Sequence, residues 1–170
     1  KAAECRGQKE QLFFLQNNKG TIALTKRLSY SAPLAESSCG MHDKIKNYLI
    51  PEWTPLAFLI EQGVMNAEGA VLKQKYHKFR QINKFLEFIA GVEPFIRDTV
   101  ARSGKPFSIT DFGCGKAYLS FALYYYLHER QELPVRIHGL DLKTEVIEHC
   151  SALAKRCGYT NLDFAEGNIG

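Results

Sequence analysis

Two acids and two glycines form the strongest chemical pattern in this sequence. Asp111 lies near the end of an apolar run, residues 107–112, and Gly113 and Gly115 follow it at G-x-G spacing. Because glycine lacks a Cβ, the backbone turns tightly at these positions and lets a ligand approach closely. A second acid, Asp141, ends the next apolar run. A carboxylate there accepts hydrogen bonds from a pair of hydroxyls, while Asp111 suits an ammonium group, directly or through water.

Strands and helices are predicted to alternate around these residues. In chain order they are strand 107–112, helix 116–128, strand 135–140, helix 144–157 and strand 162–166. This alternation predicts parallel pairing through right-handed crossovers. The carboxyl ends of the strands then meet at one edge, where ligands bind in such sheets. The predicted fold class is therefore α/β: half of a Rossmann-like sheet in strand order 3-2-1, preceded by a small α+β region.

The predicted ligand has an amino-acid end for the first acid and a ribose for the second. S-adenosyl-L-methionine (SAM) has both and is the predicted cofactor. Lys116 opposes the dipole of the helix that it begins, so it either holds the methionine carboxylate or points into solvent. Asn168 either bonds the adenine amine or is an ordinary turn residue. The residues predicted to contact the cofactor are Asp111, Gly113, Cys114, Gly115, Lys116, Asp141, Leu142, Asn168 and Ile169. No catalytic residue and no metal ligand is assigned.

Two other glycine-loop motifs fit less well. A dinucleotide fingerprint needs a third glycine where Tyr118 stands. A phosphate-binding P-loop needs glycine in place of Thr110 and serine or threonine in place of Ala117. A purely structural strand-to-helix turn is the remaining alternative.

The region before residue 105 is predicted to fold into smaller elements. Residues 12–15 and 21–24 form a hairpin pattern, and residues 28–43 resemble a linker. Pro55 suits the first turn of a short helix that Gly63 ends. An amphipathic helix is predicted over 71–89, with a separate helical piece from Pro94 to about 102. The predicted domains are an N-terminal hairpin and linker at 1–43, a helical substrate-side region at 44–104 and the SAM-binding half-domain at 105–170.

The net charge of +4 is unevenly distributed. Residues 1–104 hold 15 Lys and Arg against 10 Asp and Glu, and residues 105–170 hold 7 against 8. The basic excess favours an acidic partner such as RNA. The helix at 71–89 concentrates it, because its cations between 73 and 84 have no acid among them. The alternative is a solvated face over an apolar stripe.

Cysteine usage and hydropathy bear on location. The five cysteines are an odd number without a C-x-x-C pair, which predicts reduced thiols and a cytoplasmic protein. Cys150 and Cys157 are interpreted as packing residues. Cys39 and His42 have ligand-like spacing but lack a partner pair, so no metal is predicted. No run of eighteen apolar residues occurs, so no membrane span is predicted.

The motifs resemble those of class I SAM-dependent methyltransferases. The resemblance rests on Asp111-Phe-Gly-Cys-Gly-Lys-Ala and on Gly139-Leu-Asp-Leu-Lys. More narrowly, the chain resembles a methyltransferase-domain family of bacterial proteins and of eukaryotic proteins described as containing an rRNA-adenine-dimethylase domain, over residues 42–170. This resemblance implies a SAM-dependent methyltransferase with Asp111, Gly113, Gly115 and Asp141 as cofactor contacts. Such enzymes often carry glycine where Ala117 stands and aspartate where Asn168 stands.

The resemblance also implies that the chain is truncated at its C-terminal end. Seven strands are expected in that fold, and the fourth would pair beside the strand at 107–112. We therefore expect this strand to be an open edge, and we expect the chain alone to be inactive. Two functional classes remain: a methyltransferase whose acceptor is unknown, with RNA a candidate, and a non-catalytic methyltransferase-like module that binds nucleic acid.

Overall fold

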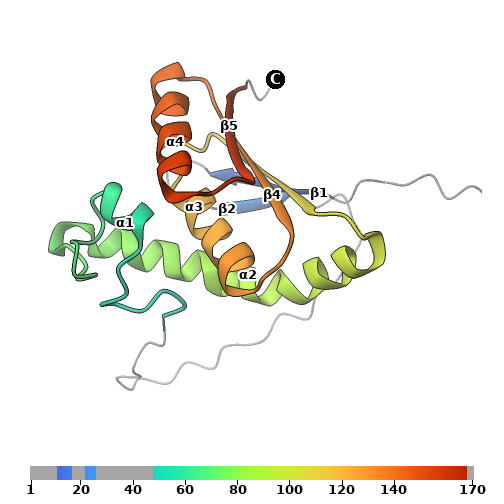
Figure 1. Cartoon of the computed structure of the whole chain (residues 1–170), viewed down its shortest axis with the longest axis horizontal. Helices are drawn as coiled ribbons and strands as arrows, with labels where there is room; N and C mark the ends of the chain where they lie inside the picture. Colours follow the sequence, from blue (N-terminus) through green and yellow to red (C-terminus); the bar gives the residue numbers. More distant parts are fainter. Residues whose placement is uncertain (1–10, 17–21, 26–47, 168–170) are drawn as a thin grey trace, which may run out of the picture.

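A computed structural model describes residues 11–16, 22–25 and 48–167 (Figure 1). Its sheet has five strands in the order β2-β1-β3-β4-β5. The strands are β1 (Gln11–Gln16), β2 (Ile22–Thr25), β3 (Phe107–Phe112), β4 (Val135–Asp141) and β5 (Leu162–Glu166). The helices are α1 (Ala57–Glu61), the 3-10 helix η1 (Lys73–Lys75), α2 (Tyr76–Ser103), α3 (Tyr118–Tyr124), the π-helical turn η2 (Tyr125–Arg130) and α4 (Thr144–Cys157).

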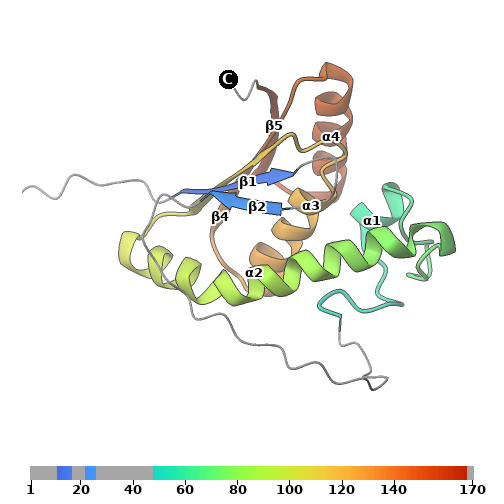
Figure 2. The same ribbon diagram turned by 180° about the vertical axis from the view of Figure 1, so that it is seen from behind.

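The C-terminal part of the sheet confirms the predicted order and direction of strands. β3 pairs parallel with β4, and β4 pairs parallel with β5. The register places Asp111 of β3 opposite Gly139 of β4. Each crossover is a helix, α3 with η2 and then α4, and these helices lie on the same side of the sheet in both views (Figures 1 and 2). The α/β, Rossmann-like half-fold is therefore present.

The far side of β3 differs from the prediction. β1 and β2 form the predicted antiparallel hairpin, but β1 also pairs parallel with β3 from Gln11↔Ser108 to Leu15↔Phe112. The expectation that β3 is an open edge is wrong. An unpaired edge presents a row of N–H and C=O groups that readily pair with another strand. Here β1 is the strand that pairs with this edge of β3.

α2 is a single helix of 28 residues that crosses beneath the sheet (Figure 1). The expected start at Val71 is wrong, because Val71 forms an isolated bridge with Met65 and the helix begins at Tyr76. The expected break before Pro94 is also wrong. Proline lacks one backbone donor, but the helix continues because buried side chains on both sides of it, such as Ile89 and Ile96, pack into the core.

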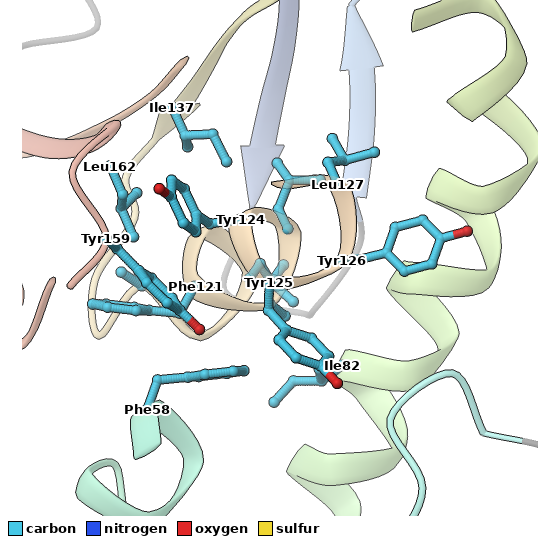
Figure 3. Close-up of a cluster of buried hydrophobic side chains, with 14 of the residues drawn as sticks. Phe58, Ile82, Phe121, Tyr124, Tyr125, Tyr126, Leu127, Ile137, Tyr159 and Leu162 are labelled. Carbon is cyan, nitrogen blue, oxygen red and sulfur yellow. The ribbon is translucent and has the colours of Figure 1, made fainter. Parts of the chain in front are cut away.

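A cluster of aromatic rings joins α1 to the helices of the sheet (Figure 3). Phe58 of α1 stacks on Phe121 of α3 at 6.0 Å between centroids and lies 6.2 Å from Tyr125. Tyr159, which follows α4, stacks on Tyr124 at 4.4 Å. α3 is itself part of the core, since all its residues from Leu119 to Tyr124 are buried. The segment that contains α1 therefore packs into the same core as β3, β4 and their helices.

Candidate cofactor site at the glycine loop

The loop after β3 has an open, left-handed backbone. Gly113 and Gly115 have φ of 68° and 53°, and Ala117 has φ of 54°. Left-handed φ is easy for glycine and costs other residues roughly 1–2 kcal/mol. This cost gives a physical reason for the glycine that the resemblance implies at the position of Ala117. A Cβ added at either glycine would meet no atom within 4 Å, so the loop surface is free for a ligand to approach.

Asp141 connects the end of β4 to this loop. Its Oδ2 accepts a 2.9 Å hydrogen bond from the Gly115 N–H, and its Oδ1 accepts one of 3.1 Å from the Lys143 N–H. The carboxylate therefore holds the loop in place. A carboxylate offers about four acceptor positions, so these two bonds leave capacity for hydroxyl groups. The predicted bonds to a ribose stay a prediction.

Asp111 lies beneath the loop and is 4% exposed. Its Oδ2 accepts a 2.5 Å hydrogen bond from the Ser120 hydroxyl of α3. Burial raises the pKa of Asp111 to about 6, the Ser120 hydrogen bond opposes this rise, and the charge of Asp141 adds to it. A positively charged group bound nearby would favour the ionised form, so the site is electrostatically suited to a cationic ligand end.

Cys114 contributes its backbone to the loop and its side chain to the core. The Cys114 N–H donates to the Leu140 carbonyl at 2.9 Å, and the residue is 4% exposed. Cys150 of α4 packs below, with its Sγ 3.4 Å from the Gly115 carbonyl oxygen. Burial raises the pKa of Cys150 to about 11 and raises the pKa of Cys114 as well. Both are thus neutral packing thiols, as interpreted for Cys150, and a cofactor contact of Cys114 is left to its backbone.

The other predicted contacts lie around the loop or outside the described residues. Lys116 is exposed, and its carbonyl accepts a 2.7 Å hydrogen bond from the Gln62 side chain. Leu142 is 71% exposed directly after Asp141. Asn168 and Ile169 lie outside the described residues, but the preceding Gly167 donates its N–H to the Asp141 carbonyl at 3.1 Å.

Three site residues were not predicted from the sequence. Ser120 had a signal, because a small polar residue inside an apolar helix needs a hydrogen-bond partner. Gln62 had none, since its contact joins positions 54 residues apart. Its Oε1 is buried without a partner in the described part of the chain. Lys78 of α2 lies 5.1 Å from the Tyr118 ring centroid, which brings the start of α2 to the start of α3.

The described ranges contain neither a metal cluster nor a membrane-spanning helix. Residues 48–167 and the two described strands contain no group of three or more His, Cys, Asp or Glu side chains arranged to hold a metal ion. Within the same residues, no helix has the length and apolar character needed to cross a membrane. Cys39 and His42 fall outside the described residues.

A glycine loop between two acids at the carboxyl edge of a parallel sheet is typical of a Rossmann-like fold. The chain belongs to a methyltransferase-domain family, whose model matches residues 77–170, more than half of its length. This match spans nearly all of α2, the loop and both acids. No curated protein matches the chain. The narrower resemblance to proteins with an rRNA-adenine-dimethylase domain stays a prediction.

Parts of several solved structures are similar to this chain. A crystal structure of WbdD, described as a bifunctional kinase-methyltransferase, is 26% identical over 51% of this chain and 17% of its own, with a TM-score of 0.38. The CMeT domain of the citrinin polyketide synthase is 28% identical over 52% of this chain and 23% of its own, with a TM-score of 0.37. The chain thus matches less than a quarter of the length of these proteins.

Proposed function

We propose that the glycine loop binds SAM and that the chain supplies the cofactor-binding half of a SAM-dependent methyltransferase. One observation carries the proposal: Asp111 and Asp141 flank an open glycine loop. Asp111 is buried against Ser120, and Asp141 holds the loop through Gly115. The two acids lie at the same sheet edge, at the ends of neighbouring strands.

The charge of the site supports SAM over a nucleotide with a phosphate chain. SAM carries a sulfonium and an ammonium group, and two carboxylates stabilise such cations. The same carboxylates would repel a pyrophosphate. Tyr118, which begins α3, also stands where a dinucleotide loop needs its third glycine. The residues present therefore fit SAM better than either rival.

Six of the predicted contacts act through their side chains in this proposal. Asp111 accepts from the ammonium group, and Lys116 holds the carboxylate. Asp141 accepts from the ribose hydroxyls, and Leu142 packs against adenine together with Ile169, while Asn168 bonds its amine. When bound, SAM supplies an electrophilic methyl group, and transfer to an amine depends mainly on alignment. The residues named here bind and orient the cofactor, and none of them is assigned a catalytic role.

The acceptor and the location complete the proposal. RNA is the proposed acceptor class, on the basis of the cations in η1 and in the first part of α2. Lys73, Arg80 and Lys84 are exposed there. A cytoplasmic location is proposed because the described cysteines Cys114, Cys150 and Cys157 are free thiols.

A paired ligand and residue change tests the cofactor proposal. Calorimetric titrations would measure the affinity of the chain and of its Asp141→Ala variant for S-adenosylhomocysteine and for a dideoxyribose form of it. Losing a charged acceptor costs about 1.5–3 kcal/mol, so the substitution should weaken binding of the intact ligand about ten- to a hundredfold. The dideoxy ligand should bind the native chain about as weakly as the intact ligand binds the variant.

Comparing the four affinities separates a ribose contact of Asp141 from a structural role, because Asp141 also holds the loop. If Asp141 only stabilises the loop, its loss should weaken both ligands by the same factor. Glu148→Ala, which removes an exposed acid of α4, is the matched control and should leave both affinities unchanged. No binding of either ligand by a folded native chain would reject SAM as the cofactor.

A further inference from the structure

A loop before α1 holds an exposed tryptophan in a strained backbone. Trp53 is 70% exposed and has φ of 66°, which is left-handed and rare for a bulky residue. The Trp53 N–H donates to the Gly69 carbonyl at 2.9 Å. A Cβ at Gly69 would lie 2.8 Å from the backbone of Trp53 and Pro55. The segments around Trp53 and Gly69 therefore pack backbone to backbone, and the ring is displayed to solvent instead of being buried.

Aromatic and basic side chains continue from this loop onto the start of α2. Glu52, the neighbour of Trp53, accepts a 2.5 Å hydrogen bond from the Tyr76 hydroxyl. The Arg80 guanidinium lies 5.8 Å from the Tyr76 ring centroid. The exposed Lys73 lies in the turn before Tyr76. We call Trp53, Lys73, Tyr76 and Arg80 the Trp53 surface.

The Trp53 surface lies on the other side of α2 from the contact that joins this helix to the start of α3. Lys78, two residues after Tyr76, packs over the ring of Tyr118, which begins α3 directly after the glycine loop. Tyr76 and Arg80 are separated from Lys78 around the helix, so they lie about one helix diameter, roughly 10–12 Å, from that contact. A flexible oligomeric ligand a few monomers long can span this distance.

We infer that the Trp53 surface binds single-stranded RNA and guides it toward the cofactor site. Exposed aromatic rings stack on unpaired bases, and cations contact the phosphates. Between residues 73 and 84 the sequence contains five Lys or Arg residues and no acid, which complements a polyanion. This inference rests on the proposed methyltransferase function and names its substrate class.

The acids near this surface favour RNA over DNA. Glu52 lies within the surface and is engaged by Tyr76, while Glu68 is exposed in the loop that ends at Gly69. A carboxylate repels a phosphate, but it accepts a hydrogen bond from a 2′-hydroxyl, which only RNA carries. Glu87 is paired with Lys84 at 2.8 Å, farther along α2.

The single tryptophan of the sequence makes this inference directly measurable. An RNA of about twelve unpaired nucleotides would be titrated into the chain while the tryptophan fluorescence is recorded. Stacking should quench the emission, and added salt should weaken the affinity steeply. Anisotropy of the labelled RNA would give the affinity of variants that lack the ring.

Two substitutions separate recognition from folding. Trp53→Gly removes the ring and also relieves the left-handed strain, so it should fold at least as well as the native chain while binding RNA about ten- to a hundredfold more weakly. Trp53→Phe keeps a stacking ring and should retain most of the affinity. Lys73→Ala should reduce the salt dependence, whereas Lys105→Ala, an exposed lysine beyond the end of α2, should not.

The outcomes distinguish this inference from the cofactor proposal, because SAM affinity is measured on the same samples. RNA binding that Trp53→Gly leaves unchanged would overturn the inference. So would an equal affinity for DNA of the same sequence, or an absence of RNA binding by a chain that binds SAM. A chain that binds RNA through Trp53 but does not bind SAM would instead reject the proposed function.

Discussion

The glycine loop and the Trp53 loop both contain left-handed backbone conformations, but these conformations have opposite effects on what each loop exposes. Gly113 and Gly115 take left-handed φ so that the main chain is bare and open. At Trp53 a bulky residue takes left-handed φ, and Gly69 provides the close backbone packing that holds it there. The first loop exposes backbone and keeps its acids paired, whereas the second exposes a side chain. In our proposals the first loop is a small-ligand site and the second is part of a broader contact surface.

The largest expected effect tests whether the two regions share one core. Phe58→Ala removes a ring that is 0% exposed and contacts Phe121 and Tyr125. Deletion of a buried Phe typically costs about 3–5 kcal/mol, measured as the free energy of unfolding in urea. Phe88→Ala, which truncates a ring that is 48% exposed on α2, should cost far less. Equal costs would mean that α1 does not pack into the core.

The next effect sets stability against function at Asp111. Its folded pKa of about 6 lies above the ordinary value of 3.8, a rise worth about 3 kcal/mol. Because the folded state binds the proton more tightly, the stabilisation is full below about pH 3.8 and is lost as the pH rises through about 6. Asp111→Asn should therefore stabilise the chain at neutral pH and flatten this dependence, as followed by urea unfolding across the pH range.

The same substitution should have the opposite effect on ligand binding. The neutral amide of the Asp111→Asn variant offers no charge to the ammonium group of SAM, so affinity should fall while the melting temperature rises. In the native chain, SAM affinity should increase as the pH rises through about 6, since the ionised acid is the binding form. Stabilisation without any loss of affinity would assign Asp111 a purely structural role.

A smaller effect compares two glycines of the Trp53 region. Gly69→Ala adds a Cβ 2.8 Å from backbone atoms at φ of +84°, whereas Gly63→Ala meets no atom within 4 Å at φ of +65°. The second change should cost only the left-handed penalty of about 1–2 kcal/mol. The first should cost more and should also alter the tryptophan emission. Thermal melts of both variants check the ranking, and the reverse order would contradict the close packing at Gly69.

The smallest expected effect concerns the far end of α2. Asp98 and Arg102 form an i,i+4 pair at 2.8 Å with side chains 63% and 60% exposed. Such pairs contribute about 0.3–0.5 kcal/mol. Asp98→Ala should therefore change the free energy of unfolding only at that level, and less in high salt. A cost above that of Gly63→Ala would show that this end is more ordered than its exposure indicates.

Local patterns predicted the cofactor half well. Periodicity located β3, α4 and β5, and the right-handed crossover rule gave their order. Contacts between distant segments were not predictable in this way. The pairing of β1 with β3 joins residues about a hundred positions apart, and no local signal specifies such a register. The helix break predicted at Pro94 does not occur, because tertiary packing outweighs one lost hydrogen bond. The sequence pattern does not show that packing.

The candidate site shows the same division. Asp111, Asp141 and the glycines are recognisable from residue type and spacing alone. The hydrogen bonds of Asp111 to Ser120 and of Lys116 to Gln62 depend on how α1 and α3 pack. Trp53 stands between Pro51 and Pro55 in the sequence, but its exposure and its strain follow from the close approach of Gly69.

The central claim is that the open glycine loop is the SAM site, and amide NMR tests it most directly. The chain would be titrated with S-adenosylhomocysteine while the backbone amide signals are followed. The largest shifts should occur at Gly113, Gly115 and Lys143, with Gly69 and Gly104 unchanged. Saturable shifts confined to other parts of the chain, or none at all from a folded sample, would contradict the account.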